Sequence, residues 1–181
     1  MKGLLIPALL CLNSLIFAEN LLTKECSGFE CDAIPKNLHP MWGEKDRVKI
    51  TGEESYCGKK SLKIDFSKKM QRVFIHAPVQ EFKEGDTYTV SAFVKTPDGK
   101  SRVTLFLWSC EKLWSGAQTH KFEAKPVTPD WTQIKLTAKL KKDGRYLGIL
   151  FYSPDEISIY VDEVKLEKGD KASWSEPEGK K

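Results

Sequence analysis

The stretch TYTVSAFVK (Thr87–Lys95) indicates the fold class of this sequence, because every second side chain in it is apolar. Neighbouring side chains of a β-strand point to opposite faces of its sheet. The apolar set of Tyr88, Val90, Ala92 and Val94 is therefore expected to face a core. The mixed set between them, which includes Phe93, is expected to face outward.

The stretch SRVTLFLWSC (101–110) alternates in the same way and leaves Phe106 and Trp108 on its outward face. Two strands that are neighbours in the sequence thus both carry large aromatic side chains outward. Single apolar residues are common on protein surfaces, but a cluster of them marks a binding surface. The sequence therefore predicts an aromatic surface built from Phe93, Phe106 and Trp108.

Similar strand patterns recur along the chain, at 61–66, 72–77, 88–95, 102–108, 132–140, 146–152 and 157–161. Turn-forming stretches separate them, such as TPDGK at 96–100 and KDG at 142–144. No convincing amphipathic helix of four turns interrupts the series. Many short strands with turns between them predict an all-β protein, a β-sandwich.

The chain of 181 residues has room for one domain with a real core. Its start, MKGLLIPALLCLNSLIFAEN, has a basic residue, an apolar run and a small residue at Ala18, which predicts a signal peptide over 1–18. An uncleaved anchor is the alternative. We expect a domain over 19–175, a polar tail over 176–181, and export to the extracellular space or periplasm. No later segment has the length of a membrane span.

The net charge and the cysteines bear on the ligand class and on the cellular compartment of the protein. The net charge of +4 is mild, and lysines are scattered among glutamates, which argues against nucleic-acid binding. Cys26, Cys31, Cys57 and Cys110 remain after the signal peptide, and disulfides are expected in an oxidising compartment. Their pairing stays open among three possibilities, and their spacing does not match a zinc site.

Several pieces together resemble the carbohydrate-binding modules of the family 4, 9 and 22 group. They are ENLL (19–22), GFE (28–30), GEESYCGKKSLKI (52–64), FKEGDTYTVSAFVKTP (82–97), TPDWTQIKL (128–136) and ISIYVDEVKLEKG (157–169). The resemblance implies a jelly-roll β-sandwich of two antiparallel sheets, like a galactose-binding domain. It also implies a secreted, non-catalytic module that binds a polysaccharide or oligosaccharide.

The same resemblance implies a structural calcium ion between the N-terminal segment and the last strand. The matching residues are Glu30 of GFE, Glu54 before SYCG, and Asp162 of YVDEV. Calcium takes oxygen ligands, and such an ion would explain a carboxylate at an inward position of a strand. The alternatives are an exposed Asp162 or pairing with lysine. Cys31 and Cys57 flank these segments, so a disulfide there would replace or supplement the metal.

Sugar binders place aromatic rings against the apolar faces of sugars and use polar groups for the hydroxyls. The polar candidates are Gln71, Arg72 and His76, which precede or belong to one predicted strand. The loop aromatics Trp42 and Trp114 are expected at the rim, and so is Tyr152 at the end of its predicted strand. The alternatives are that Trp108 packs beneath the loop after it and that His76 is a structural residue.

The sequence gives no sign of catalysis. It lacks GxSxG, HExxH and phosphate-binding glycine loops, and His39, His76 and His120 show no triad context. We therefore expect a non-enzyme that binds a glycan and acts beside a separate glycoside hydrolase or within a surface assembly. The first alternative is a secreted β-sandwich with a structural or protein-interaction role and no glycan ligand. The second is a small hydrolase, which would place two carboxylates across a pocket.

Overall fold

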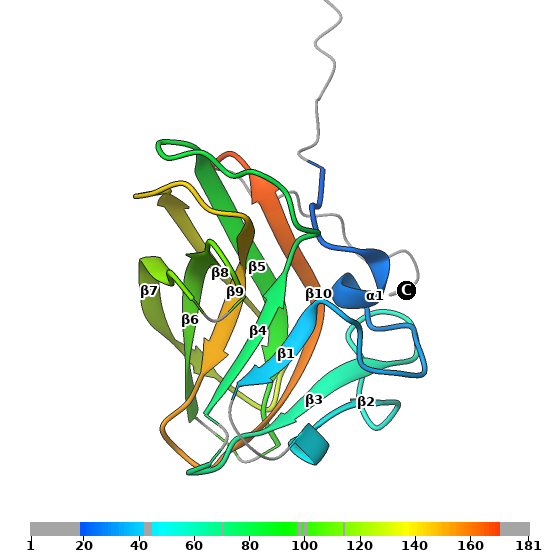
Figure 1. Cartoon of the computed structure of the whole chain (residues 1–181). Helices are drawn as coiled ribbons and strands as arrows, with labels where there is room; N and C mark the ends of the chain where they lie inside the picture. The colour runs from blue at the N-terminus through cyan, green and yellow to red at the C-terminus, as the bar shows by residue number, and fades with distance from the viewer. Residues whose placement is uncertain are drawn as a thin grey trace, which may run out of the picture.

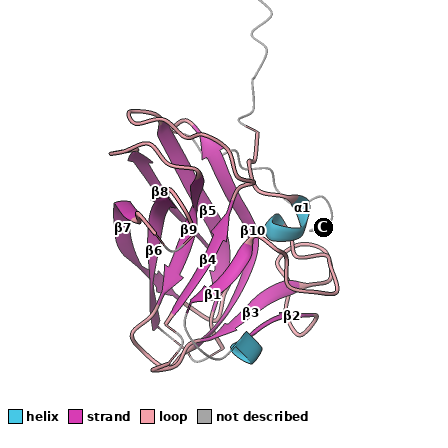
Figure 2. Ribbon diagram, viewed as in Figure 1, coloured by secondary structure: helices cyan, strands magenta, loops and turns pink. Residues whose placement is uncertain are grey.

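The chain folds as two stacked β-sheets, which Figure 1 and Figure 2 show as two layers of strands with very little helix. The computed structural model describes residues 19–41, 45–69, 71–97, 99, 101–113 and 115–170. A short helix, α1 (Lys24–Ser27), and one 3-10 turn, η1 (Lys45–Arg47), lie outside the strands. The predicted signal peptide and tail lie outside the described residues.

Sheet I has the strand order β1-β4-β9-β6-β7, and all its neighbouring strands pair antiparallel. Its strands are β1 (Leu38–Met41), β4 (Arg72–His76), β9 (Tyr146–Tyr152), β6 (Ser101–Cys110) and β7 (Gln118–Val127). A side chain at Gly148 of β9 would collide with the Ile75 carbonyl oxygen and lie 2.6 Å from the His76 Cα. Only glycine therefore allows β4 and β9 to approach this closely.

Sheet II has the order β2-β3-β10-β5-β8 and is likewise antiparallel. Its strands are β2 (Val48–Thr51), β3 (Ser61–Asp65), β10 (Ser158–Lys168), β5 (Thr87–Lys95) and β8 (Thr132–Lys139). The two sheets close over a core that includes Val90, Leu105 and Phe151. Burial of this apolar surface is the main force that holds the layers together.

The predicted strands are confirmed with small changes at their ends, and the two antiparallel sheets confirm the β-sandwich. The structure adds β1, β2 and β7, which the sequence patterns did not predict. β10 runs on past Val161 to Lys168, with a β-bulge between Asp162 and Lys165. Glu163 takes a positive φ of 47° there. Asp162 lies opposite Phe93 on the outer face of sheet II, and it is fully buried there beneath the 52–60 loop.

Candidate functional site

The outer face of sheet I carries a second hydrophobic cluster, separate from the core between the sheets. We call this surface the aromatic face. Its buried members are Met41, Phe74, Trp108, Cys110 and Leu150, and Phe106, Leu113, Tyr146 and Tyr152 pack against them half-buried. An apolar cluster on the outside of a sandwich does not help to join its sheets. It is therefore the first candidate for a binding surface.

Strand register arranges the aromatic face as rows that cross the sheet. Phe74 of β4 lies opposite Leu150 of β9, which lies opposite Phe106 of β6, which lies opposite Phe122 of β7. The Phe106 and Phe122 ring centroids are 5.4 Å apart, and their planes differ by 25°. Four neighbouring strands thus contribute one continuous apolar row.

Only part of this row is open to solvent. Phe74 is fully buried, and Trp108 is only 8% exposed. Their rings meet edge to face at a centroid distance of 4.7 Å. The Trp108 ring thus packs onto the sheet, as the alternative had it, but it also lines the cavity described below, so its contact with a sugar stays a prediction. Phe106, half-buried, keeps its predicted place on the surface.

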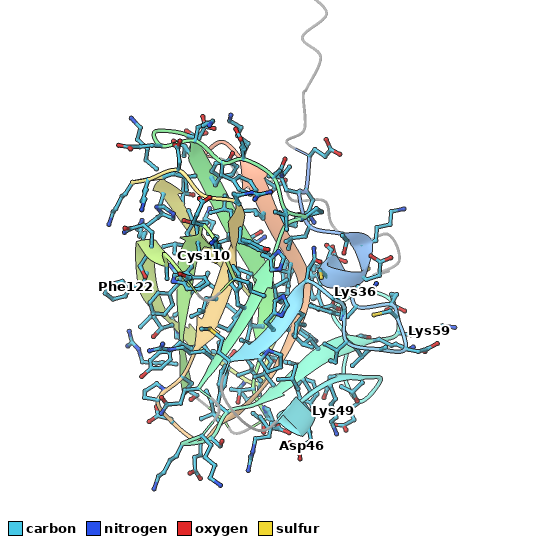
Figure 3. All side chains as sticks on the ribbon, viewed as in Figure 1. Lys36, Asp46, Lys49, Lys59, Cys110 and Phe122 are labelled. Carbon is cyan, nitrogen blue, oxygen red and sulfur yellow. The ribbon has the colours of Figure 1, made fainter. Side chains whose placement is uncertain are left out.

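Phe122 is the most exposed aromatic residue of this face, at 64% exposure, and Figure 3 shows its ring projecting from β7. The sequence analysis missed it because β7 was not predicted as a strand. A register shift at His120, which the sequence does not reveal, places Phe122 opposite Phe106 on the outward face. Phe122 extends the open aromatic surface to the edge strand of sheet I.

A cavity of about 120 Å³ opens on the aromatic face between β4, β9, β6 and β7. Its lining residues are Met41, Arg72, Phe106, Trp108, Thr119 and Leu150. Arg72 is half-buried, and its guanidinium carbon lies 5.5 Å from the centre of the Tyr152 ring. Apolar walls with one directed cationic group are the arrangement expected of a small-molecule or glycan site. The predicted residues Arg72, Phe106 and Tyr152 are thus brought together.

His39 and His76 form a pair at the β1–β4 side of the aromatic face. Their Nε2 atoms are 3.1 Å apart and their rings are parallel within 2°. His76 Nδ1 donates to the Ala77 carbonyl oxygen, so its Nε2 accepts the proton of His39 Nε2. His76 is only 4% exposed. These contacts favour the structural alternative for His76, and its contact with a sugar stays a prediction.

Acid should destabilise the fold through its histidines. Burial lowers the pKa of His39 and of His120 to about 4, and also lowers that of His76. An unfolded histidine titrates near 6.5, so between about pH 6.5 and 4 the unfolded chain binds more protons and stability falls as pH falls. Burial raises the pKa of Asp162 to about 6, which opposes this in part.

His120, only 3% exposed, should contribute about 2 kcal/mol of this loss between pH 7 and 5. Urea unfolding at the two pH values measures it. A His120→Asn variant, which keeps an acceptor for the Lys141 N–H, should lose less stability on acidification. Equal unfolding free energies at both pH values for the wild type would contradict the assignment of neutral buried histidines.

Phe93 lies on the other side of the molecule from Phe106 and Trp108, which corrects the predicted aromatic surface. Its strand β5 belongs to sheet II, whereas β6 belongs to sheet I. Phe93 is 9% exposed and is covered by the Tyr56 ring at a centroid distance of 3.6 Å. Trp131 meets Tyr56 edge-on at 5.9 Å. These rings hold the 52–60 loop against sheet II.

For three other predicted sugar contacts, Trp42, Trp114 and Gln71, the structure gives no evidence of ligand binding. Trp42 and Trp114 lie outside the described residues, and both stay predictions. Gln71 is half-buried just before β4, and its backbone oxygen accepts the Ser153 N–H. Tyr152 is the last residue of β9, where the predicted strand also ends, and it lies on the aromatic face.

The predicted calcium ligands Asp162 and Glu30 both hold the 52–60 loop through its backbone. Asp162 Oδ2 accepts the N–H groups of Tyr56 at 2.8 Å and Cys57 at 3.0 Å, and Oδ1 accepts that of Glu163 at 2.8 Å. Glu30 Oε1 accepts the N–H groups of Lys59 at 2.7 Å and Lys60 at 2.8 Å. We call this arrangement the carboxylate clamp.

The clamp does not fit a calcium centre. Calcium needs six to eight oxygen ligands, and three of the clamp's carboxylate oxygens already accept five backbone N–H groups. Glu54, the third predicted ligand, pairs with Lys95 at 2.9 Å. Within the described part of the chain, no three histidine, cysteine, aspartate or glutamate side chains are grouped to hold a metal ion. The carboxylate is buried, as the metal site would require, but it lies on the outer face of sheet II instead of pointing inward, and backbone amides are its partners.

The predicted disulfides are not formed. None of Cys26, Cys31, Cys57 and Cys110 forms a disulfide; Cys26 and Cys110 are buried, and the other two are half-buried. Cys110 belongs to the aromatic face, whereas Cys26 lies in the core between the sheets. Burial raises the pKa of the Cys26 thiol, which makes it a poor nucleophile.

A buried Ser–His pair in the described chain is not set up for nucleophilic catalysis. Ser109 Oγ lies 2.7 Å from His120 Nε2, and His120 Nδ1 accepts the Lys141 N–H at 2.9 Å. The Nε2 atom of a neutral imidazole must then carry the proton, so it donates to Ser109 instead of removing its proton. Ser109 and His120 are also 1% and 3% exposed, so substrate has no access.

Comparisons with known proteins identify the fold. No family model and no curated protein matches the sequence. The CBM22-1 xylan-binding domain of Paenibacillus barcinonensis Xyn10C matches with a TM-score of 0.60 at 18% identity, over 84% of this chain and 96% of that chain. The C-terminal family 22 module of Clostridium thermocellum Xyn10B matches with a TM-score of 0.57 at 15% identity, over 78% and 90%.

A third match is TmCBM61 in complex with β-1,4-galactotriose, with a TM-score of 0.56 at 14% identity, over 84% of this chain and all (100%) of that one. None of the helices within the described residues could cross a membrane. At 14–18% sequence identity, the structural similarity shows a shared fold. The chain is a jelly-roll β-sandwich with the fold of carbohydrate-binding modules, as the sequence resemblance implied.

Proposed function

We propose that this protein is an exported, non-catalytic glycan-binding module that holds its ligand on the aromatic face of sheet I. The observation that carries the proposal is the open apolar row of Phe106 and Phe122 beside the cavity that Arg72 lines. Aromatic rings stack on the C–H faces of sugars, and arginine donates to hydroxyl groups. Each structural neighbour named above is a carbohydrate-binding module, which supports the same function.

We propose that the module binds its glycan without cleaving it. Glycoside hydrolysis needs two carboxylates across a cleft. Among the described residues, no aspartate or glutamate lines the cavity of the aromatic face. We propose that the module brings a glycan to a partner, such as a separate glycoside hydrolase or a surface assembly.

Affinity electrophoresis of the mature protein through gels that contain soluble polysaccharides tests the function. The panel should include xylan, β-1,4-galactan, mixed-linkage β-glucan and acidic polysaccharides. We expect retardation by at least one glycan and none in a gel without polysaccharide. Unchanged mobility in every gel contradicts glycan binding and favours a β-sandwich with a structural or protein-interaction role.

A further inference from the structure

β7 is the last strand of sheet I, so one of its two long edges has no partner strand within the described residues. Figure 1 shows this strand at the outer margin of the sandwich. Four consecutive residues of it, 121–124, are exposed, and Phe122 projects into solvent at 64% exposure (Figure 3). An open strand edge presents backbone N–H and C=O groups that can pair with a strand of another chain. β7 is therefore a candidate for strand pairing between molecules.

Backbone hydrogen bonds in sheet I show which residues of each strand bond to which neighbour. The Ala77 N–H donates to the Leu147 carbonyl oxygen. The Ser153 N–H, just after β9, donates to the Gln71 carbonyl oxygen. Odd-numbered residues of β9 therefore bond to β4, and because successive residues of a strand bond to opposite neighbours, even-numbered residues bond to β6. They lie opposite even-numbered residues of β6, which leaves the odd-numbered residues of β6 to bond to β7.

The same alternation shows which backbone groups of β7 point to the open edge. From 121 to 127, odd-numbered residues of β7 lie opposite odd-numbered residues of β6 and bond to them. The backbone groups of Phe122, Ala124 and Pro126 therefore point away from β6. Pro126 supports this assignment, because proline within a sheet occurs where its missing N–H would face solvent. The open edge thus offers N–H donors at Phe122 and Ala124, and carbonyl acceptors at all three residues.

β7 complements itself when two copies lie antiparallel with Ala124 opposite Ala124. Each Ala124 N–H then meets the Ala124 carbonyl oxygen of the other copy. Each Phe122 N–H meets the Pro126 carbonyl oxygen of the other copy, so the donors of both open edges are used between 122 and 126. Arg102 already donates to the Ala124 carbonyl oxygen at 3.5 Å, and the second lone pair of that oxygen accepts the new bond.

Side-chain charges fit the same register. Glu123 of each copy lies opposite Lys125 of the other, on the side of the sheet where the two residues pair at 2.7 Å within one chain. With Phe122 opposite Ala124, Glu123 would instead lie opposite Glu123, and like charges directly opposite each other are destabilising. With Phe122 opposite Phe122, Ala124 would lie opposite the β-bulge at His120, where ladder bonds are disrupted. Of these three registers, the one centred on Ala124 alone satisfies both the donors and the charges.

We propose that this protein forms a two-fold dimer in which the β7 strands of two copies pair antiparallel about Ala124. The two copies of sheet I then form one continuous sheet. A contact of this kind uses the same surface on both copies and closes after two, so it does not lead to a filament. Its two-fold axis is perpendicular to the sheet, which places both aromatic faces on the same side, with Phe122 of each beside the junction. Under the proposed function, a glycan chain that spans both faces is bound with avidity.

Sedimentation equilibrium of the mature protein, from low micromolar to submillimolar concentration, tests for the dimer without any glycan. We expect a reversible monomer–dimer equilibrium for the wild type. Glu123→Lys and Lys125→Glu each place like charges opposite each other at both symmetric positions, so each should weaken dimerisation by about tenfold or more. Lys36→Glu changes an exposed charge across the molecule from Phe122 (Figure 3) and should leave dimerisation unchanged.

Charge exchange tests the register. An equal mixture of Glu123→Lys and Lys125→Glu should dimerise as strongly as the wild type, because every charge at the junction again faces an opposite one. The double variant that carries both changes should do the same. Amide hydrogen exchange gives a second readout in the wild type. The Phe122 and Ala124 N–H groups should exchange more slowly as protein concentration rises, whereas that of Glu123, which bonds to β6, should not change.

A wild type that stays monomeric over the whole concentration range overturns the dimer. An equal weakening by Lys36→Glu, or single variants that do not associate when mixed, also overturns it, because general charge repulsion or another contact then explains the data. Exchange at Phe122 and Ala124 that does not depend on concentration, in a sample that does dimerise, places the contact elsewhere and overturns it too. Thermal unfolding checks that each variant is folded. Glycan binding is tested separately by affinity electrophoresis, so failure of the dimer leaves the proposed function standing.

Discussion

Phe106→Ala is expected to weaken glycan binding by more than tenfold while the protein stays folded. Phe106 lines the cavity and lies in the row between Leu150 and Phe122, so its loss removes the apolar floor of the site. A tenfold loss corresponds to about 1.4 kcal/mol, which is within the range measured for single aromatic contacts. Isothermal titration with the polysaccharide that retains the wild type measures the change.

Two further variants make this result interpretable. Phe122→Ala should also weaken binding, and at 64% exposure the ring contributes little to folding. Trp131→Ala removes a half-buried aromatic from the opposite side of the molecule and should leave binding unchanged. An unchanged affinity in both phenylalanine variants, or an equal loss of affinity in Trp131→Ala, would contradict the assignment of the aromatic face as the glycan-binding site.

Asp162→Ala is expected to lower the free energy of unfolding by about 3 kcal/mol. The change leaves the N–H groups of Tyr56, Cys57 and Glu163 without their acceptor, at about 1–3 kcal/mol for each group that stays buried. The cost of burying the carboxylate, which raises the Asp162 pKa to about 6, offsets part of that sum at pH 7. Urea unfolding of the variant and the wild type gives the difference.

The Asp162→Ala variant also tests whether the carboxylate clamp binds a calcium ion. Glu163→Gln, a neighbouring change that leaves the carboxylate clamp in place, serves as the control and should unfold like the wild type. Because backbone amides occupy the clamp, excess EDTA and added calcium should give the wild type the same melting temperature. A melting temperature raised by calcium in the wild type and not in Asp162→Ala would restore the metal site that the family resemblance implied.

Alternation along a strand predicts which face a side chain occupies but not which sheet the strand joins. The outward position of Phe93 on its strand was predicted correctly, and so was that of Phe106. Their strands are consecutive in the sequence, yet β5 pairs with β8 and β10 while β6 pairs with β7 and β9. That pairing arises from long-range contacts, so the two aromatics end on opposite sides of the sandwich.

Two other errors have local physical causes. β7 escaped prediction because it is an edge strand, whose inward positions Lys121 and Glu123 are exposed and break the apolar alternation. Phe122 was missed with it. The burial of Asp162 could be predicted from its place in YVDEV, but its partners could not. Two of its three N–H donors come from a loop 105 and 106 residues away in the chain.

The location of bound glycan is the most direct test of this account. Isotope-labelled protein is titrated with an oligosaccharide of the retained polysaccharide, and aromatic and backbone NMR shifts are followed. We predict shifts at Arg72, Phe106 and Phe122 on the aromatic face, with Tyr56 and Phe93 of the opposite side unchanged. Shifts confined to the Tyr56–Phe93 side, or none with any glycan, would contradict the claim that the aromatic face is the binding site.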